Sequence, residues 1–399
     1  MPFFAALPVK GDSFLLSTGQ KMALVDGGYS SAALIAPLGF VGHLDVVICT
    51  HGDRDHAGGV TDLLGQPGAP TVGEFWLPGR WAEHLAALLL DPERFVAQLG
   101  EEIYALLAEQ PNFDSALPLE ELALGDYEPA ALENGFAELP PAHSDHVLDA
   151  DPPWWTALAA EVQRSSRRSP SWRTPTAPAE DASGPLSEGE RARREAIVAD
   201  AIDTADLIYK IAKQAASHRV PVRWFDFEAF ALGHAPAGGW PKILAPVNAC
   251  EMLAPPSPPR NSIARYIALS RINRESLVFQ AIETSMMPSV LFCGDSPLRG
   301  GRPTPWPGFR STPTKGLLAT APHHGRKSNA GAYAIVDTWK PRGRVTWVKA
   351  GNAKPPCHEL RARDRSCTEC AGLSLRPTVF APAAVAAWGW WSSDPLCSC

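Results

Sequence analysis

The sequence predicts an α/β protein in which two β-rich segments flank a long, mostly helical one. Short apolar runs separated by turns fill the first sixty residues, helical spacing takes over after residue 80, and strand-like runs return after residue 220. The chain has 399 residues, 45% hydrophobic and 20% charged, which is the composition of a globular protein with one large domain or two smaller ones. Its net charge of -7 provides no overall basic field, so contact with nucleic acid would need a local patch.

The first β-rich segment contains four short apolar runs that predict strands at residues 1–8, 13–17, 22–25 and 44–50. The last run is rich in β-branched residues, as expected of a strand that is covered on both faces. It ends at a polar cluster that begins with His51. Polar side chains gathered at the end of a buried strand indicate a functional site.

The middle of the chain has the spacing of helices. From Arg80 to Gln110 apolar residues recur at helical intervals, with Pro92 at a position that suits a first turn. Residues 163–186 are rich in Ser, Arg, Pro and Thr and predict a flexible loop. Ser187-Glu-Gly-Glu190 then matches a capping box, which predicts a helix that ends near His218.

The second β-rich segment completes the predicted organisation. Strand-like runs occur at residues 220–225, 242–244, 276–282, 289–293, 316–321 and 344–349. The predicted units are a first half of the domain at 1–80, a helical insertion at 81–235, a second half at 236–355 and a Cys-rich tail at 356–399. The longest apolar run, Val379 to Trp391, is shorter than the ~20 residues of a membrane span, and eight cysteines are too few for a disulfide scaffold. We therefore expect a cytoplasmic protein with no membrane segment.

The strongest chemical signal is HGDRDHAGG at residues 51–59, which places four metal-ligand side chains within six residues. A loop that leaves a strand can turn alternate side chains toward one point. His51 and Asp53 then suit one ion, and Asp55 and His56 suit a second. Imidazole and carboxylate ligands together favour Zn, Mn or Fe. The alternative is a polar surface turn in which the histidines have no function.

HGDRDHAGG resembles the HxHxDH metal motif of the metallo-β-lactamase fold, in the HxDxDHxGG form of ComEC-like DNA-uptake proteins and related hydrolases. Three further segments match that subgroup in the same order: GDSFLL followed by LVDGG within residues 11–28, LFCGD at 291–295, and APHHGRKS at 321–328. The resemblance covers about residues 1–80 and 240–350. It implies the αββα sandwich of the metallo-β-lactamase type, with the helical insertion and the tail added to it.

The resemblance also implies the roles of individual residues. It gives up to two divalent ions, Zn or Mn, in the active site, held by His51, Asp53, Asp55, His56, Asp295 and His323. Asp295 matches the carboxylate that usually bridges the two ions. The expected catalytic residues are Asp55, which orients water, His324, which protonates a leaving group or contacts a phosphate, and Lys327, which neutralises an anionic substrate together with Arg326. Arg326 and Lys327 are equally compatible with a solvated loop.

The sequence departs from the usual family pattern at three places. Asp53 replaces a histidine, which shifts preference toward Mn without excluding Zn. The segment at 271–279 has no histidine where many relatives have one, so one metal site is expected to be weak or to fill only with substrate. Arg326 stands where a serine usually follows His-His-Gly. Four other histidines in or near the insertion are weaker candidates for the mouth of the site, since such residues more often lie on the surface or in the core: His143, His146, His218 and His234.

Metal-dependent hydrolysis is the expected reaction, because a divalent ion lowers the pKa of bound water from about 15.7 to about 7. The resemblance favours a phosphodiester, which would make the protein a nuclease or phosphodiesterase acting on nucleic acid or a nucleotide. Two alternatives stay open: hydrolysis of a thioester, lactone or lactam, and a metal-stabilised binding module without turnover.

The tail has its own candidate metal ligands. Cys367-Thr-Glu-Cys370 is a CxxC pair, Cys357 precedes it, and Cys397 and Cys399 end the chain. This spacing suits one structural zinc, which would anchor a tail too short to form a core of its own. Reduced free thiols or adventitious disulfides explain the pattern equally well.

Overall fold

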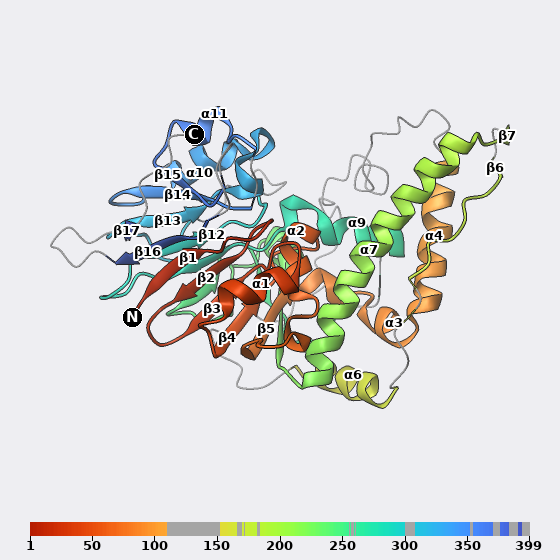
Figure 1. The fold of residues 1–399 in the computed structure, drawn as a ribbon, viewed down its shortest axis with the longest axis horizontal. Coiled ribbons are helices and arrows are strands. Elements are labelled where there is room, and N and C mark those ends of the chain that lie inside the picture. Colours follow the sequence, from red (N-terminus) through yellow and green to blue (C-terminus); the bar gives the residue numbers. More distant parts are fainter. Residues whose placement is uncertain are drawn as a thin grey trace.

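Two mixed β-sheets pack face to face at the centre of the protein, and helices cover both outer faces (Figure 1). The computed structural model describes residues 1–109, 152–165, 170, 172–181, 184–254, 256, 259, 261–299, 308–351, 354–369, 376–382 and 390–392. The arrangement is an αββα sandwich of the metallo-β-lactamase type, which confirms the fold class that the sequence predicts.

The first sheet has the strand order β10-β8-β5-β4-β3-β2-β1-β16-β17 among the described residues. The strands β1, β2 and β3 form an antiparallel meander, whereas β3, β4, β5 and β8 are parallel neighbours. Its strands are β1 (Phe3–Ala6), β2 (Phe14–Ser17), β3 (Met22–Val25), β4 (His43–Ile48), β5 (Thr71–Pro78), β8 (Val222–Asp226), β10 (Cys250–Glu251), β16 (Thr378–Pro382) and β17 (Trp390–Ser392). The strand β8 falls within the range 81–235, so the central sheet takes one strand from the end of that range.

The second sheet has the order β15-β14-β13-β12-β11-β9 within the described part of the chain. Its parallel strands β12, β13, β14 and β15 all point in one direction, so their carboxyl ends meet at one edge. Its strands are β9 (Leu244–Pro246), β11 (Phe279–Ala281), β12 (Ser289–Phe292), β13 (Leu317–Thr320), β14 (Val345–Lys349) and β15 (Arg365–Cys367). A separate short hairpin joins β6 (Glu180–Asp181) and β7 (Gly184–Pro185).

Apolar side chains fill the space between the sheets and under each helical layer. Phe4 and Ile48 of the first sheet meet Phe292 of the second in the central layer. The neighbouring residue Val47 points to the opposite face of β4 and packs under the helices instead. This alternation within β4 explains why both of its faces are apolar and why the predicted strand lacks a polar face.

Helices from the middle of the chain cover the outer face of the first sheet, at the right of Figure 1. The largest is α7, which begins with the predicted capping box at Ser187 and Glu190 and ends at His218, as expected. The helices of this layer are α1 (Ser31–Leu38), α3 (Leu85–Leu90), α4 (Pro92–Ala108), α6 (Pro153–Arg164), α7 (Glu188–His218) and α9 (Ile263–Arg271). On the other face of the sandwich, α8 (Phe227–Ala231), α10 (Gly331–Thr338) and α11 (His358–Arg361) pack on the second sheet.

The described residues of the stretch predicted as a loop at residues 163–186 lie against the helices. The hydroxyl of Tyr104 on α4 donates to the carbonyl of Pro175 at 2.7 Å. The ring of Trp172 stands edge-on against Tyr209 of α7, with centroids 5.2 Å apart. These contacts tie the described part of the stretch to the helical layer.

The described residues of the tail contribute to both sheets. β15 extends the second sheet, and β16 pairs with β1 at the edge of the first. Leu360 and Phe380 are buried in the core. These residues are therefore held by apolar burial and strand pairing.

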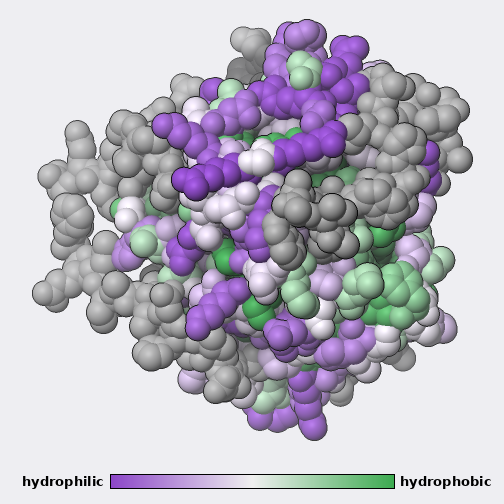
Figure 2. Space-filling model, turned by 90° about the vertical axis from the view of Figure 1, so that its left-hand side faces the viewer, coloured by the Kyte–Doolittle hydropathy of each residue, from purple (hydrophilic) through white to green (hydrophobic). Residues whose placement is uncertain are grey.

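On the face at the left of Figure 1, the described surface carries both hydrophilic and hydrophobic side chains (Figure 2). Figure 2 shows the face at the left of Figure 1, where hydrophilic side chains cover much of the upper part and hydrophobic ones form smaller groups among them. Large exposed apolar residues such as Phe40 and Met286 come from separate turns. Within the described residues, none of the helices combines the length and apolar character of a membrane span.

Candidate metal centre

The predicted ligands converge where strands of both sheets end. The loop after β4 carries the residues from His51 to His56 and contains the short helix α2 (Arg54–Ala57). Asp295 follows β12, and the pair His323 and His324 follows β13. Since β12 and β13 are parallel, their ends deliver these side chains to the same edge.

The first candidate ligand group comprises His51, His56 and Asp295, and all three are buried. One ligand atom from each lies within 4.8 Å of the others. Nε2 of His56 is 3.0 Å from Oδ1 of Asp295, and Nε2 of His51 is 3.8 Å from Oδ2. Asp53 lies beside this group, with its Oδ2 3.6 Å from Nε2 of His51.

The second candidate group comprises Asp55, His56 and His324, so the two groups share His56. Nε2 of His324 lies 2.7 Å from Oδ2 of Asp55. The structure thus brings His324, the residue expected to be catalytic, into a ligand group. Its neighbour His323, the residue expected to be a ligand, is outside both groups.

His323 instead lies at the edge of the site, with a side chain that is 20% exposed. Its Nδ1 is 2.8 Å from the side-chain Nδ2 of Asn273 and 3.7 Å from Oδ2 of Asp295. Burial lowers the pKa of His323, which favours the neutral imidazole. His323 and His324 both have left-handed backbone, with φ values of 50° and 52°, and this turn sends the two rings in different directions.

Each histidine in the two groups is oriented by a second polar contact. Nδ1 of His56 lies 2.8 Å from Asp26, and Nδ1 of His324 lies 2.9 Å from Asp12. Nδ1 of His51 lies 3.0 Å from the hydroxyl of Thr50, which itself donates to Asp26. These contacts leave Nε2 of every ring directed into the site, as in carboxylate–histidine–metal arrangements.

The charges in the site are strongly coupled. Burial raises the pKa of Asp295, but His56 and His51 outweigh it and hold that pKa well below its usual range. Burial lowers the pKa of His56, but Asp295 and Asp26 raise it well above its usual value. For His324, Asp12 and Asp55 outweigh burial and raise the pKa to about 10. Without an ion, the carboxylates therefore hold protons on these imidazoles.

The side chains present fit a divalent metal. Among the described residues, Nε2 of His51 and Nε2 of His56 are buried and form no hydrogen bond of good geometry, although carboxylate oxygens lie 3.0–3.8 Å away. A divalent ion among these nitrogens and oxygens would satisfy them. Imidazole and carboxylate donors together suit Zn or Mn.

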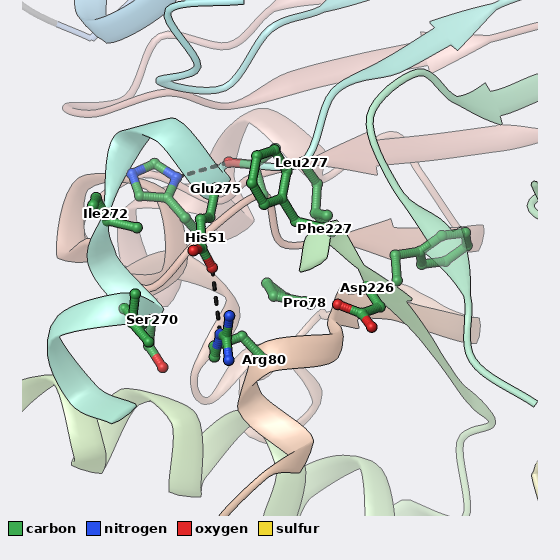
Figure 3. Close-up of a pocket in the computed structure, with 12 residues that line it drawn as sticks. His51, Pro78, Arg80, Asp226, Phe227, Ser270, Ile272, Glu275 and Leu277 are labelled. Carbon is green, nitrogen blue, oxygen red and sulfur yellow. Dashed lines mark hydrogen bonds and ion pairs between the residues drawn. The ribbon is translucent and has the colours of Figure 1, made fainter. Parts of the chain in front are cut away.

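A small cavity of about 10 Å³ lies beside His51, enough for a single water molecule (Figure 3). Arg80 lines it and forms ion pairs of 3.3 Å with Glu275, Glu83 and Glu228. Burial raises the pKa of Glu275, and Arg80 only partly offsets this. The ionic network is satisfied within itself, so the cavity is better suited to an ordered water than to a substrate.

The rim of the site contains an aromatic side chain, Tyr29, and a basic one, Arg326. Tyr29 is 48% exposed, and burial, with added effect from the carboxylates of Asp55 and Asp53, raises the pKa of its phenol. Arg326 is exposed, and its charge acts on both Tyr29 and His323. Lys327, one of the expected catalytic residues, is exposed one position further along the chain.

Two helices of the layer that covers the first sheet, α9 and α7, reach the metal loop. Nε of Arg271, the last residue of α9, donates to Oδ1 of Asp53 at 3.1 Å, and the same guanidinium contacts Asp200 of α7. The amide of Gly52 donates to the carbonyl of Ser270 at 2.8 Å. In the sequence, Arg271 and Asn273 belong only to the segment at 271–279 that lacks the usual histidine, and nothing there indicates the contact of Arg271 with Asp200.

The other sequence candidates lie apart from these groups or outside the described residues. His218 is exposed at the end of α7 and His234 is half-buried after α8, and neither joins a ligand group in the described part of the chain. The same holds for Cys357 and Cys367. Five candidates lie outside the described residues: His143, His146, Cys370, Cys397 and Cys399. The structural zinc stays a prediction.

Comparison with known families supports the metal centre. Residues 6–88 match the family model described as the metallo-beta-lactamase superfamily. The match includes the whole loop from His51 to Gly59, while Asp295 and His324 lie beyond it. No curated protein sequence matches the chain significantly. The chain is thus similar to this superfamily in its first ligand segment, and it has the superfamily's αββα fold around that segment.

Proposed function

We propose that this protein is a metal-dependent hydrolase that cleaves phosphodiester bonds, with nucleic acid or a nucleotide as its substrate. The observation that carries the proposal is the pair of ligand groups that share His56 and adjoin Asp295. These residues would hold up to two divalent ions, the number that an in-line displacement at a phosphodiester can use. The similarity to the metallo-beta-lactamase superfamily agrees with hydrolysis.

The geometry suggests which residues hold each ion. His51, Asp53 and Asp295 would hold one ion. Asp55, His56 and His324 would hold the other. The two sets of ligands are adjacent, because Oδ1 of Asp295 lies 3.0 Å from Nε2 of His56. This assignment makes His324 a ligand. When bound, divalent ions supply a strong nucleophile at neutral pH by lowering the pKa of water.

His323 is then the histidine that contacts the substrate. The amide of Asn273 donates to Nδ1 of His323, which places the ring proton on Nε2. A neutral imidazole in this tautomer donates a hydrogen bond to a phosphate or leaving-group oxygen. Tyr29, a neutral phenol at pH 7, offers a second donor at the same rim.

The basic residues at the rim favour an anionic substrate. Arg326 is exposed close to His323, and Lys327 follows it. They provide local positive charge in a chain whose net charge is -7. A phosphodiester matches this local charge better than a neutral ester, and it is also the substrate class of the ComEC-like proteins that the motifs resemble.

The direct test is to measure the metal content by elemental analysis and then assay cleavage with Mn or Zn. The substrates are single-stranded DNA, duplex DNA, RNA and bis-p-nitrophenyl phosphate, with a thioester and a lactone as comparison. We expect metal-dependent turnover of a phosphodiester. Turnover of the thioester or lactone alone would identify a different hydrolase, and inactivity with every metal and substrate would identify a binding module.

Single substitutions test the assignment of the site. Asp55→Ala and His56→Ala are expected to abolish turnover while the circular dichroism spectrum stays native, because both residues lie beyond the end of β4. Asp295→Ala should also lower the metal content, since this carboxylate adjoins both groups. Near-normal turnover in Asp55→Ala or His56→Ala would refute the site.

A further inference from the structure

The two ligand groups differ in the charge of the residues behind them. His324, which belongs to the second group alone, is backed by the carboxylate of Asp12, and His56, which both groups share, is backed by that of Asp26. Anionic partners of this kind strengthen histidine ligands. Asp53, beside the first group, is instead backed by the cationic guanidinium of Arg271, whose Nε lies 3.1 Å from Oδ1. A fixed positive charge therefore lies next to Asp53, the carboxylate beside the first group.

Arg271 is held in this position by the helical insertion. Its guanidinium bridges Asp53 in the metal loop and Asp200 on α7. The side chains of Arg271 and Asp53 are only 19% and 25% exposed, so water screens their interaction incompletely. Asp200 is 57% exposed, so its own charge is screened more strongly.

We propose that Arg271 makes the two metal sites unequal by competing with the ion for the carboxylate of Asp53. The site of Asp55, His56 and His324 binds tightly, and the site of His51, Asp53 and Asp295 binds weakly. The helix α7, through Asp200, keeps the competing guanidinium in place. The inference rests on the metal binding in the proposed function, and it gives the insertion a part in setting metal occupancy.

The opposite effect of Arg271 is also physically reasonable, and the two can be separated. A hydrogen bond to Oδ1 restricts the rotation of the Asp53 carboxylate, which by itself would favour a ligand role for Oδ2. If the orienting effect dominated, removal of the guanidinium would lower the metal affinity of the site of His51, Asp53 and Asp295. If competition dominates, its removal raises that affinity. The local charge decides for competition, since a divalent ion and a guanidinium would share one carboxylate.

The test is a metal titration that requires no turnover. Metal-free protein is equilibrated against buffered concentrations of free Zn, and separately of Mn, and the bound metal is measured by elemental analysis. We expect wild type to bind in two steps whose dissociation constants differ by at least about tenfold. Asp53→Ala should remove the weaker step. Arg271→Gln should tighten the weaker step by about tenfold, equivalent to ~1.4 kcal/mol, and leave the tighter step nearly unchanged.

Two further variants serve as controls. Arg271→Lys keeps the charge and should leave the weaker step close to that of wild type. Arg54→Gln removes an arginine of the metal loop whose guanidinium pairs with Asp203 of α7 at 3.4 Å instead of with Asp53. It should change neither step.

Several results would overturn the inference. These are an unchanged or weaker first site in Arg271→Gln, an equal gain in Arg54→Gln, or two equal steps in wild type. Absence of any bound metal would instead refute the proposed function itself, so the two failures are distinguishable.

Discussion

Each buried histidine of the metal centre uses one ring nitrogen for orientation and directs the other toward the site. Asp26 is central to this arrangement, because it accepts from the amide and the hydroxyl of Thr50 and contacts Nδ1 of His56. Its own backbone is left-handed, with φ of 58°. Asp26 belongs to neither ligand group. It nevertheless orients the ring of His56 directly and the ring of His51 through Thr50.

Asp26→Asn is expected to lower metal affinity by about 10–100-fold, because the amide is uncharged and supports His56 less well. The fold should persist, since the substitution keeps the shape of the side chain. Metal affinity is measured by competition with a chromophoric chelator. The matched control is Asp45→Asn, which removes a carboxylate on β4 that contacts Lys21 and Met22 away from the site. Equal effects of the two variants would contradict the orienting role.

Metal binding should release protons. The pKa of His324 is raised from 6.5 to about 10, so in the metal-free protein the resulting stability is fully present below pH ~6.5 and is lost as the pH rises through about 10. An ion must displace this proton. We expect release of at least one proton per protein at pH 7–8, and affinity that rises with pH by up to about tenfold per unit. Isothermal titration calorimetry in two buffers with different ionisation enthalpies measures the release. Identical apparent enthalpies in the two buffers would contradict it.

At the scale of elements, the metal loop is fixed by close packing of glycine backbones. Gly27, after β3, and Gly59, after α2, approach so closely that a Cβ on Gly59 would overlap the carbonyl oxygen of Gly27. The amide of Gly59 also donates to Gly28 at 2.6 Å. The two matched segments LVDGG and HAGG therefore form one packed unit that supports the ligands.

Gly59→Ala should destabilise the protein by about 1–3 kcal/mol, because backbone atoms must move to accommodate the methyl group. His56 lies three residues away, so metal content should also fall. Gly65→Ala is the control, since nothing lies within 4 Å of a Cβ at that position, and its effect should stay within about 0.5 kcal/mol. Urea denaturation measures both changes. Equal stabilities of the two variants would show that the close approach of Gly59 has no energetic importance.

The sequence predicts elements best where one signal dominates. β3 occupies the predicted residues 22–25, and α7 begins at its predicted cap. β5 escapes prediction because Gly73, Glu74 and Pro78 interrupt its apolar pattern, although it lies between β4 and β8 in the sheet. Tertiary pairing decides such a strand, and a local pattern does not contain that information.

The candidate site shows the same limit. Most of the ligand set is predictable, because four of its side chains lie within six residues of one loop. The other two, Asp295 and His324, follow strands that the sequence predicts. The contact of Arg271 with Asp53 spans 218 positions and that of Asn273 with His323 spans 50, so spacing gives no indication of either. The distinction between His323 and His324 depends on left-handed backbone at both residues, which a sequence of non-glycine residues does not predict.

At the scale of the whole molecule, the C-terminal region closes the edge of the first sheet. Phe380 on β16 is 2% exposed and packs at a tilt against Phe4 of β1, with ring centroids 6.0 Å apart. The two ends of the described chain thus depend on each other for burial. This packing explains how a tail without a core of its own is held in the fold.

Phe380→Ala should lower the free energy of unfolding by about 3–5 kcal/mol, the usual cost of removing a buried phenylalanine ring. The neighbouring Val379 is 38% exposed on the same strand. Val379→Ala should cost less than about 1 kcal/mol. Guanidinium denaturation compares the two. If Phe380→Ala unfolded at the denaturant concentration of wild type, burial of the tail would contribute nothing to stability.

The separation of the ligands along the chain has a consequence for folding kinetics. Asp55 and His324, which lie 2.7 Å apart, are separated by 269 positions, so they meet only after a very large loop has closed. Closing so long a loop costs entropy before the contact contributes stability, so we expect this contact to form late in folding. An ion that needs both residues would bind after the rate-limiting barrier and would stabilise the native state alone. Bound metal should therefore slow unfolding and leave the refolding rate unchanged, which stopped-flow measurements with and without chelator would detect.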